Sequence, residues 1–228
     1  MSVSNLFKKL CYKLGFDSDP ELTAVHQFID EIAKEVISGV KLLDAGAGQC
    51  QYKNKFSHTQ YIAVDFAQGD KGWDYSNLDI TCSLHKIPLE TNSIGAIICI
   101  QVMEHIPNPA EVLAELFRVL RPGCALYISV PFASGEHQIP HDYYRYTRYA
   151  WSHLLKQAGF NVNYIRPVNG YFFRLFCELR VSGKYLKNSI WHVPFLMFQI
   201  FLAIFMRQLE KKDHDQVYTG SFHIKAVK

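Results

Sequence analysis

The chain has 228 residues, of which 49% are hydrophobic and 20% are charged. This composition suits the core of one α/β domain and excludes an intrinsically disordered chain. The net charge of +3 comes from scattered basic residues, so no nucleic-acid-binding surface is indicated. The six cysteines show no C-x-x-C spacing, which argues against a zinc knuckle or a thioredoxin-like site and favours buried free thiols.

The first residues lack the basic and apolar regions of a signal peptide. We therefore expect a cytoplasmic protein, with or without association with a membrane. Residues 1–19 have the pattern of a basic amphipathic segment. Asp19 and Pro20 then provide an N-cap and a first helical position, and apolar residues at helical spacing continue to about residue 38.

Short apolar runs and helical patterns alternate after that point. Each apolar run predicts a buried strand of a parallel sheet, because both of its faces are apolar. Four such runs predict strands over 40–44, 61–65, 94–100 and 125–130. A further strand is expected around 160–165, and alternating polar and apolar residues predict a last strand over 221–227. Helices are expected over 109–120 and 147–158, with two more within 171–206. This alternation predicts an α/β fold with helices on both faces of the sheet.

We expect one domain, 1–228, with four parts. These are N-terminal helices (1–39), a core (40–165), an apolar helical cap (166–215) and a last strand (216–228). The apolar run 193–206 is shorter than the ~18–20 residues that span a bilayer as a helix. It is interpreted as a buried or interfacial helix, and 190–206 is the candidate segment for peripheral membrane contact.

A glycine turn follows the first predicted strand. Gly46 and Gly48 allow a sharp bend and the close approach of a ligand, and open α/β sheets bind ligands beyond the carboxyl ends of their strands. A dinucleotide loop needs a third glycine at position 51, but Gln51 stands there, which argues against NAD or FAD. Asp65 ends the second strand, where a carboxylate can accept hydrogen bonds from both hydroxyls of a ribose. The alternative for Asp65 is a helix cap or turn residue at the end of the strand, which the glycine turn upstream makes less favoured.

Four blocks in this order and spacing resemble the class I S-adenosylmethionine-dependent methyltransferases in their small form. They are 42–48, 61–65, 97–106 and 118–123. The resemblance covers about 40–165 and implies a Rossmann-like sheet of seven strands, mostly parallel with an antiparallel last strand. It also implies S-adenosylmethionine as the cofactor. The apolar helical insertion before the last strand is not part of the resemblance.

The resemblance assigns the methionine end of the cofactor to Asp44, Gly46 and Gly48. It assigns binding of the ribose hydroxyls to Asp65 and places Phe66 beside the adenine.

It also implies that Gln101 lies near the floor of the cofactor pocket and that Ser83 and Leu84 meet the adenine. Many relatives have an acidic residue at the position of Ser83. A hydroxyl accepts a hydrogen bond less strongly than a carboxylate, so we expect weaker binding here.

The stretch after the fourth strand, 131–147, is rich in polar and aromatic residues. His137 or His141 could act as general base, with Asp142 orienting one of them. Arg145 and Tyr146 are candidates for binding the acceptor. Two alternatives are open: an ion pair of Arg145 could simply fix the loop, and the tyrosines could simply pack. The spacing of His137 and His141 would allow a metal pair, but the loop shows no helical pattern and no third ligand is evident, so no metal is expected.

We therefore expect methyl transfer to a small-molecule acceptor or to one linked to a lipid or glycan. The alternatives are a non-catalytic module that binds S-adenosylmethionine and a methyltransferase that acts on a protein. A nicotinamide-dependent oxidoreductase is disfavoured by Gln51. The sequence predicts no nucleic-acid partner and sets no oligomeric state.

Overall fold

The computed structural model describes residues 20–69 and 72–228, so the predicted amphipathic segment 1–19 lies outside the described residues. The chain divides into two compact units. One consists of Pro167–Gly220 with the residues up to Ala24, and the other of Val25–Arg166 with Ser221–Lys228. The single domain expected from the sequence stays a prediction.

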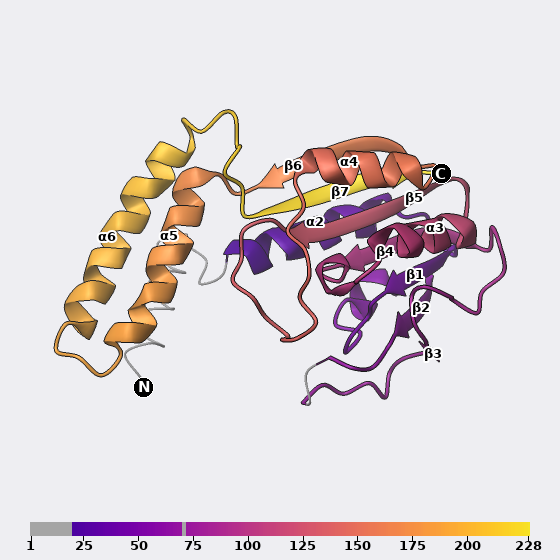
Figure 1. Ribbon diagram of the computed structural model, residues 1–228, viewed down its shortest axis with the longest axis horizontal. Helices are drawn as coiled ribbons and strands as arrows, with labels where there is room; N and C mark the ends of the chain where they lie inside the picture. Colours follow the sequence, from indigo (N-terminus) through magenta and orange to yellow (C-terminus); the bar gives the residue numbers. More distant parts are fainter. Residues whose placement is uncertain (1–19, 70–71) are drawn as a thin grey trace. The chain divides into compact units, whose positions relative to one another are not determined.

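The larger unit is built on a seven-stranded sheet in the order β3-β2-β1-β4-β5-β7-β6 (Figure 1). The strands are β1 (Lys41–Ala45), β2 (Gln60–Asp65), β3 (Ile80–Thr81), β4 (Ile94–Ile100), β5 (Leu120–Pro131), β6 (Asn161–Val168) and β7 (Ser221–Val227). β1 to β5 pair in parallel, and β7 runs antiparallel to β5. The predicted fold class is confirmed.

Helices cover both faces of this sheet because successive side chains of each strand point to opposite sides. Leu43 packs in a core with the helices α3 (Pro109–Val119) and α4 (Arg148–Gln157). Its neighbour Leu42 packs in a second core with α2 (Pro20–Glu35). Both faces of the strands are thus buried, and the carboxyl ends of β1, β2, β4 and β5 meet at one edge of the sheet.

The predicted bounds of β4 and β7 agree with the structure, whereas β5 begins five residues earlier than expected, at Leu120 rather than 125. Arg121, Pro122 and Gly123 end α3 and at the same time start the strand. The register between β4 and β5 shifts at this point, and Gly123 takes a φ of +75°. β3 is only two residues long, too short for a periodic signal.

The smaller unit contains a helical hairpin, as expected for 171–206. It consists of α5 (Tyr171–Ser182), the 3-10 turn η3 (Gly183–Leu186) and α6 (His192–Glu210). Glu210 accepts hydrogen bonds from the backbone N–H groups of Gly170 and Phe173. Asp213 accepts one from Tyr171 at 2.7 Å. Carboxylates at the end of α6 and just beyond it therefore cap the N-terminus of α5, and the two helices are antiparallel.

α6 extends beyond the apolar run from which it was predicted. Its 19 residues have a mean hydropathy of 1.4 over the most apolar window, so by length and composition α6 is able to cross a membrane. Only 17% of that window is buried. The sequence-based argument that this segment is too short to span a bilayer is therefore wrong about its length.

Candidate functional site

The glycine turn between β1 and the 3-10 turn η1 (Lys53–Phe56) is held by the neighbouring strand β2. The N–H groups of Gly46 and Ala47 donate to the carbonyl of Val64 at 2.8 and 3.0 Å. Gly46 has a φ of +85°, and a Cβ there would lie 2.4 Å from Cγ2 of Val102. A Cβ on Gly48, at φ +52°, would lie 3.0 Å from the ring of Trp73. Both glycines are therefore required by conformation and by space.

Asp65 ties the end of β2 to this turn. One carboxylate oxygen accepts from the N–H of Gly48 at 2.9 Å, and the other accepts from the N–H of Ala67 at 2.7 Å. Each oxygen has a further lone pair, so the side chain can still accept from two hydroxyls. The carboxylate points back to the glycine turn, as a ribose-binding role requires.

Asp44 lies beneath the turn and is buried, with 1% of its surface exposed. Burial raises the pKa of its carboxyl group to about 7, and the hydroxyl of Tyr61, which donates to it, opposes this effect. The nearby carboxylate of Asp65 adds to the rise. A cation bound here would restore the ionised form of Asp44, so the position suits the positively charged methionine end of S-adenosylmethionine.

The residues assigned to the adenine differ in their exposure and in their contacts. Phe66 is exposed beside Asp65, and Leu84 is buried in the core. The hydroxyl of Ser83 lies 3.0 Å from Nδ1 of His85 and accepts from the backbone N–H of His85 at 3.3 Å. This hydroxyl is engaged within its own turn, which agrees with the weaker acceptor expected at this position. Trp73, next to Gly48, had no sequence signal because its loop shows no periodic pattern.

Gln101 follows β4 in the left-handed region, at a φ of +56°. Its N–H donates to the carbonyl of Ser129 at 2.8 Å, and its side-chain amide donates to the Ser129 hydroxyl at 2.9 Å. Two hydrogen bonds to β5 thus hold Gln101 in a backbone conformation that is uncommon for residues other than glycine. Gln101 follows the carboxyl end of β4, and its place near the floor of the cofactor pocket stays a prediction.

Directly after Gln101, the 3-10 turn η2 (Met103–His105) presents two side chains that sequence reasoning did not single out. Glu104 is 2% exposed, and burial raises the pKa of its carboxyl group to about 8, against the lowering effect of Arg145. Among the described residues, neither oxygen of Glu104 nor Nε2 of His105 has a hydrogen-bond partner. The signal available in the sequence was an adjacent glutamate and histidine at the carboxyl end of a buried strand.

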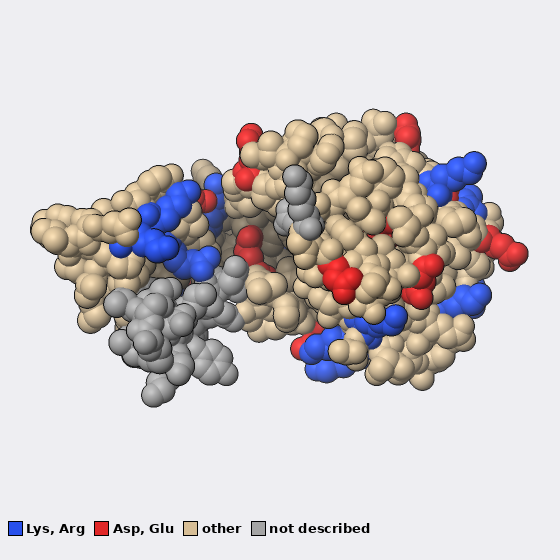
Figure 2. Space-filling model, turned by 90° about the horizontal axis from the view of Figure 1, so that it is seen from below, with Lys and Arg blue, Asp and Glu red and all other residues tan. Residues whose placement is uncertain are grey.

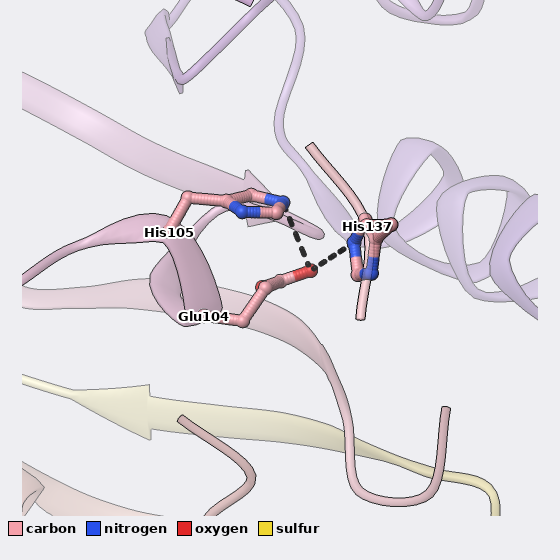
Figure 3. Close-up of side chains that lie close together, drawn as sticks. All are labelled: Glu104, His105 and His137. Atoms are coloured by element: carbon pink, nitrogen blue, oxygen red, sulfur yellow. Dashed lines mark ion pairs between the residues drawn. The ribbon is translucent and has the colours of Figure 1, made fainter. Parts of the chain in front are cut away.

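The predicted loop after β5 folds back over η2. The N–H of Tyr143 donates to the carbonyl of Glu104 at 2.8 Å, and Nδ1 of His105 lies 2.6 Å from the carbonyl oxygen of His141. Nε2 of His137 is 4.0 Å from Glu104. The loop and η2 therefore form one polar cluster, which Figure 3 shows around Glu104, His105 and His137.

Arg145 holds this loop by a two-pronged ion pair with Asp142, at 2.6 and 2.7 Å. The guanidinium holds the pKa of the Asp142 carboxyl group well below its usual range. Asp142 also accepts from the N–H of His137 at 3.0 Å. The alternative in which Arg145 fixes the loop is therefore what the structure contains, although a role in acceptor binding stays a prediction.

The remaining predicted residues of the loop lie further out or pack. His141 is exposed, with Nδ1 3.3 Å from the Tyr143 hydroxyl. Tyr146 stacks on Tyr144 and meets the ring of Trp151 edge-on, with centroids 4.8 and 5.4 Å apart. Packing accounts for Tyr146, and its predicted contact with the acceptor stays untested, as does the catalytic role of either histidine.

Comparison with known proteins gives the class to which this site belongs. Residues 43–128 match the family model described as "Methyltransferase domain". The ubiquinone biosynthesis O-methyltransferase of Hahella chejuensis is 24% identical over 141 residues, which are 54% of this chain and 58% of that protein. A probable S-adenosylmethionine-dependent methyltransferase of Mycolicibacterium smegmatis is 26% identical over 149 residues, which are 60% of this chain and 58% of that protein.

Among solved structures, the cyclase SpnF superposes with a TM-score of 0.58 at 19% identity, covering 89% of this chain and 80% of SpnF. This likeness shows the fold alone. The chain spans less than two thirds of the length of the two curated relatives.

The fold, the glycine turn and the family match all point to the same class of protein. Residues 43–128 match the methyltransferase family, and this match supports the class I S-adenosylmethionine-dependent methyltransferases, with S-adenosylmethionine as the cofactor. The resemblance and the cofactor predicted from the sequence are confirmed.

Proposed function

We propose that this chain transfers the methyl group of S-adenosylmethionine to a small-molecule acceptor or to one linked to a lipid or glycan. The observation that carries the proposal is the bond from the N–H of Gly48 to Asp65, because it holds a ribose-binding carboxylate against the turn that receives the rest of the cofactor. The sulfonium already activates the methyl group, so the protein has to align a nucleophile with the S–CH₃ bond.

The acceptor would bind beside the polar cluster of η2 and the loop after β5. These segments follow β4 and β5 at the same edge of the sheet as the glycine turn. His137 is half-buried and His141 is exposed, so an acceptor can reach both from solvent. The Hahella chejuensis relative is an O-methyltransferase of ubiquinone biosynthesis, which supports a small or lipid-like acceptor rather than a protein.

Calorimetry with S-adenosylmethionine, S-adenosylhomocysteine and NAD tests the cofactor site. We expect the first two to bind at one per chain and NAD not to bind. Transfer of a labelled methyl group to fractionated cell extract then tests the activity, and label in a low-molecular-weight or lipid fraction is expected. Binding without transfer to any fraction would favour the non-catalytic alternative, whereas label in protein would favour a protein acceptor.

We further propose that α6 contacts a lipid bilayer and thereby brings the chain to a lipid-linked acceptor. Large apolar side chains on α6 are exposed, including Met197, Phe201 and Phe205. Trp191 and Tyr185 are exposed near the hairpin's turn, and amphipathic rings of this kind favour the interface between membrane and water. Figure 2 shows Lys and Arg side chains gathered on one side of the α5–α6 hairpin, which would favour anionic lipids.

Co-sedimentation with vesicles tests this contact. Vesicles that contain phosphatidylserine should retain the chain, and phosphatidylcholine vesicles should retain less of it. Phe201→Glu, at a side chain that is 70% exposed, should release it without a change in S-adenosylmethionine affinity. Equal retention of this variant and the wild type would refute the membrane contact and leave the methyl transfer standing.

A further inference from the structure

Three side chains of the polar cluster converge without a hydrogen bond between them. Oε1 of Glu104 lies 3.7 Å from Nε2 of His105 and 4.0 Å from Nε2 of His137 (Figure 3). The possible ligand atoms of the three residues all lie within 4.8 Å of one another. These separations are too long for hydrogen bonds, so the groups do not satisfy each other.

The tautomers explain why the gap is not closed by hydrogen bonds. Nδ1 of His105 is 2.6 Å from the carbonyl oxygen of His141, an acceptor only, so the proton of this imidazole is on Nδ1. Nε2 of His105 then presents a lone pair to Glu104. Nδ1 of His137 faces two acceptors, the carbonyl of Gly135 at 3.2 Å and the carboxylate of Asp142 at 3.4 Å, and one donor, Nη2 of Arg145 at 3.4 Å. The two acceptors, of which the carbonyl is nearest, favour the same tautomer there.

Three side chains that can each offer a lone pair to a metal ion thus face a common point. The facing atoms of two of them, Glu104 and His105, are buried. Glu104 is 2% exposed, and both of its oxygens and Nε2 of His105 have no partner among the described residues. A buried carboxyl group without a partner avoids the cost of its charge either by holding a proton or by pairing with a cation, and a cation at this point would hold Glu104 in its ionised form.

We propose that Glu104, His105 and His137 bind a divalent transition-metal cation such as Zn²⁺. Two imidazoles and one carboxylate are a donor set of metal sites that keep open positions. Metal–ligand distances of about 2.0–2.2 Å place neighbouring ligand atoms about 3–3.6 Å apart, so small side-chain rotations close the site.

The surrounding groups match the outer shell of such a site. Metal-binding histidines donate their other N–H to a carbonyl or carboxylate, as His105 does to the carbonyl of His141 and as His137 can to Asp142. Arg145 in turn fixes Asp142. The side chain of His137 is 40% exposed, which leaves a path for the ion to enter. The metal pair weighed from the sequence was His137 with His141, but it is His105 that lies beside His137.

The open positions suit an acceptor oxygen, a role that rests on the proposed methyl transfer. A hydroxyl bound to the ion loses its proton to solvent more readily. The resulting oxygen anion forms the new O–CH₃ bond, the S–CH₃ bond breaks, and its electron pair stays on sulfur as S-adenosylhomocysteine leaves.

Cobalt binding without S-adenosylmethionine tests the site directly. Protein freed of metal with EDTA should bind one Co²⁺ per chain, seen by visible absorption and calorimetry, and Zn²⁺ should displace it. His137→Gln and Glu104→Gln should each weaken Co²⁺ binding by at least tenfold, and Asp142→Asn by about 10–100-fold. His153→Gln, at an exposed histidine of α4, is the matched control and should bind as the wild type does.

The two proposals fail separately. The Asp65→Ala variant should no longer bind S-adenosylmethionine but should still bind Co²⁺. The His137→Gln variant should bind S-adenosylmethionine but not Co²⁺. The ligand that each variant still binds shows that the variant is folded. Wild-type protein that binds no Co²⁺, or triad variants that bind it unchanged, would overturn the metal site whatever the methyl-transfer assay shows. Transfer to an oxygen acceptor that survives EDTA at full rate would overturn the role given to the ion.

Discussion

The carboxylate of Asp65 accepts a hydrogen bond from the backbone N–H of Gly48 at 2.9 Å, so the second strand fixes the turn that follows the first. The same side chain is assigned to the ribose, and structure and binding therefore depend on one residue. Asp65→Asn keeps a carbonyl oxygen but loses the charge, and we expect S-adenosylmethionine to bind about 10–100-fold more weakly. Calorimetry measures this, with the exposed Glu90→Gln as control. An unchanged affinity would remove Asp65 from the site.

We expect that no residue with a side chain can replace Gly46 without loss of stability as long as residue 102 is valine. Gly46→Ala places a Cβ 2.4 Å from Cγ2 of Val102, at a φ of +85°. We expect a loss of about 2–4 kcal/mol in the free energy of unfolding, from overpacking and from the left-handed backbone together.

Adding Val102→Ala removes the two closest contacts, with Cγ1 and Cγ2, but leaves Cβ of residue 102 at 3.1 Å and the backbone strain. The double variant should recover about 1 kcal/mol or more relative to the sum of the two single variants. Urea unfolding of all four proteins measures this coupling, with Gly72→Ala as control, because a Cβ there meets nothing within 4 Å. Additive effects would show that Val102 does not limit the turn.

The affinity for S-adenosylmethionine should fall below neutral pH because of Asp44. Burial raises the pKa of this carboxyl group to about 7, so it is largely protonated at pH 6 and cannot pair with a cation. We expect affinity to drop by up to about tenfold per pH unit below 7. Tyr61→Phe removes a hydrogen bond that lowers this pKa, and the drop should then begin at higher pH. Calorimetry at pH 5.5, 6.5 and 7.5 compares the two proteins, and identical profiles would exclude Asp44 as the titrating group.

His223 should make folding sensitive to acid. It is 6% exposed on β7 and stacks on Phe28 at 4.2 Å. Burial lowers its pKa to about 3, and the nearby Arg166 contributes. The folded state therefore binds fewer protons than the unfolded state below the ordinary histidine pKa of about 6.5, and stability is lost as the pH falls through that value.

Between pH 7 and pH 5 this one group should cost about 2 kcal/mol. Asp44, whose pKa is raised, acts in the opposite direction, so the measured quantity is the difference between wild type and His223→Phe. Urea unfolding at both pH values should show a smaller loss, or a larger gain, in the variant on acidification. Parallel pH dependences of the two proteins would mean that His223 titrates normally.

Much of this fold could be predicted because its strands are buried on both faces and interrupted by strong turn residues. The bounds of β4 followed from a continuous apolar run, those of β7 from alternating polar and apolar residues, and the glycine turn from Gly46 and Gly48. The start of β5 could not be predicted, because Pro122 and Gly123 are ordinary end signals for a helix and the strand continues through them.

The candidate site was predictable where it lies on strand ends and not where distant segments meet. Asp65 has a fixed place after β2, so its position was clear. Glu104 and His105 become a site only through His137, which reaches them from another loop. No local spacing in the sequence encodes that encounter, and burial of Glu104 is a property of the folded chain alone.

The place of β7 in the sheet has a consequence for the order of folding. β7 is the last strand along the chain, yet it lies between β5 and β6 and pairs with β5 from Ser221 to Val227. During synthesis β5 and β6 leave the ribosome before β7, which lies between them in the sheet. Until β7 is made, the edges of both strands are unpaired and could pair with another chain. Assembly of this half of the sheet must therefore wait until residues 221–227 have been synthesised.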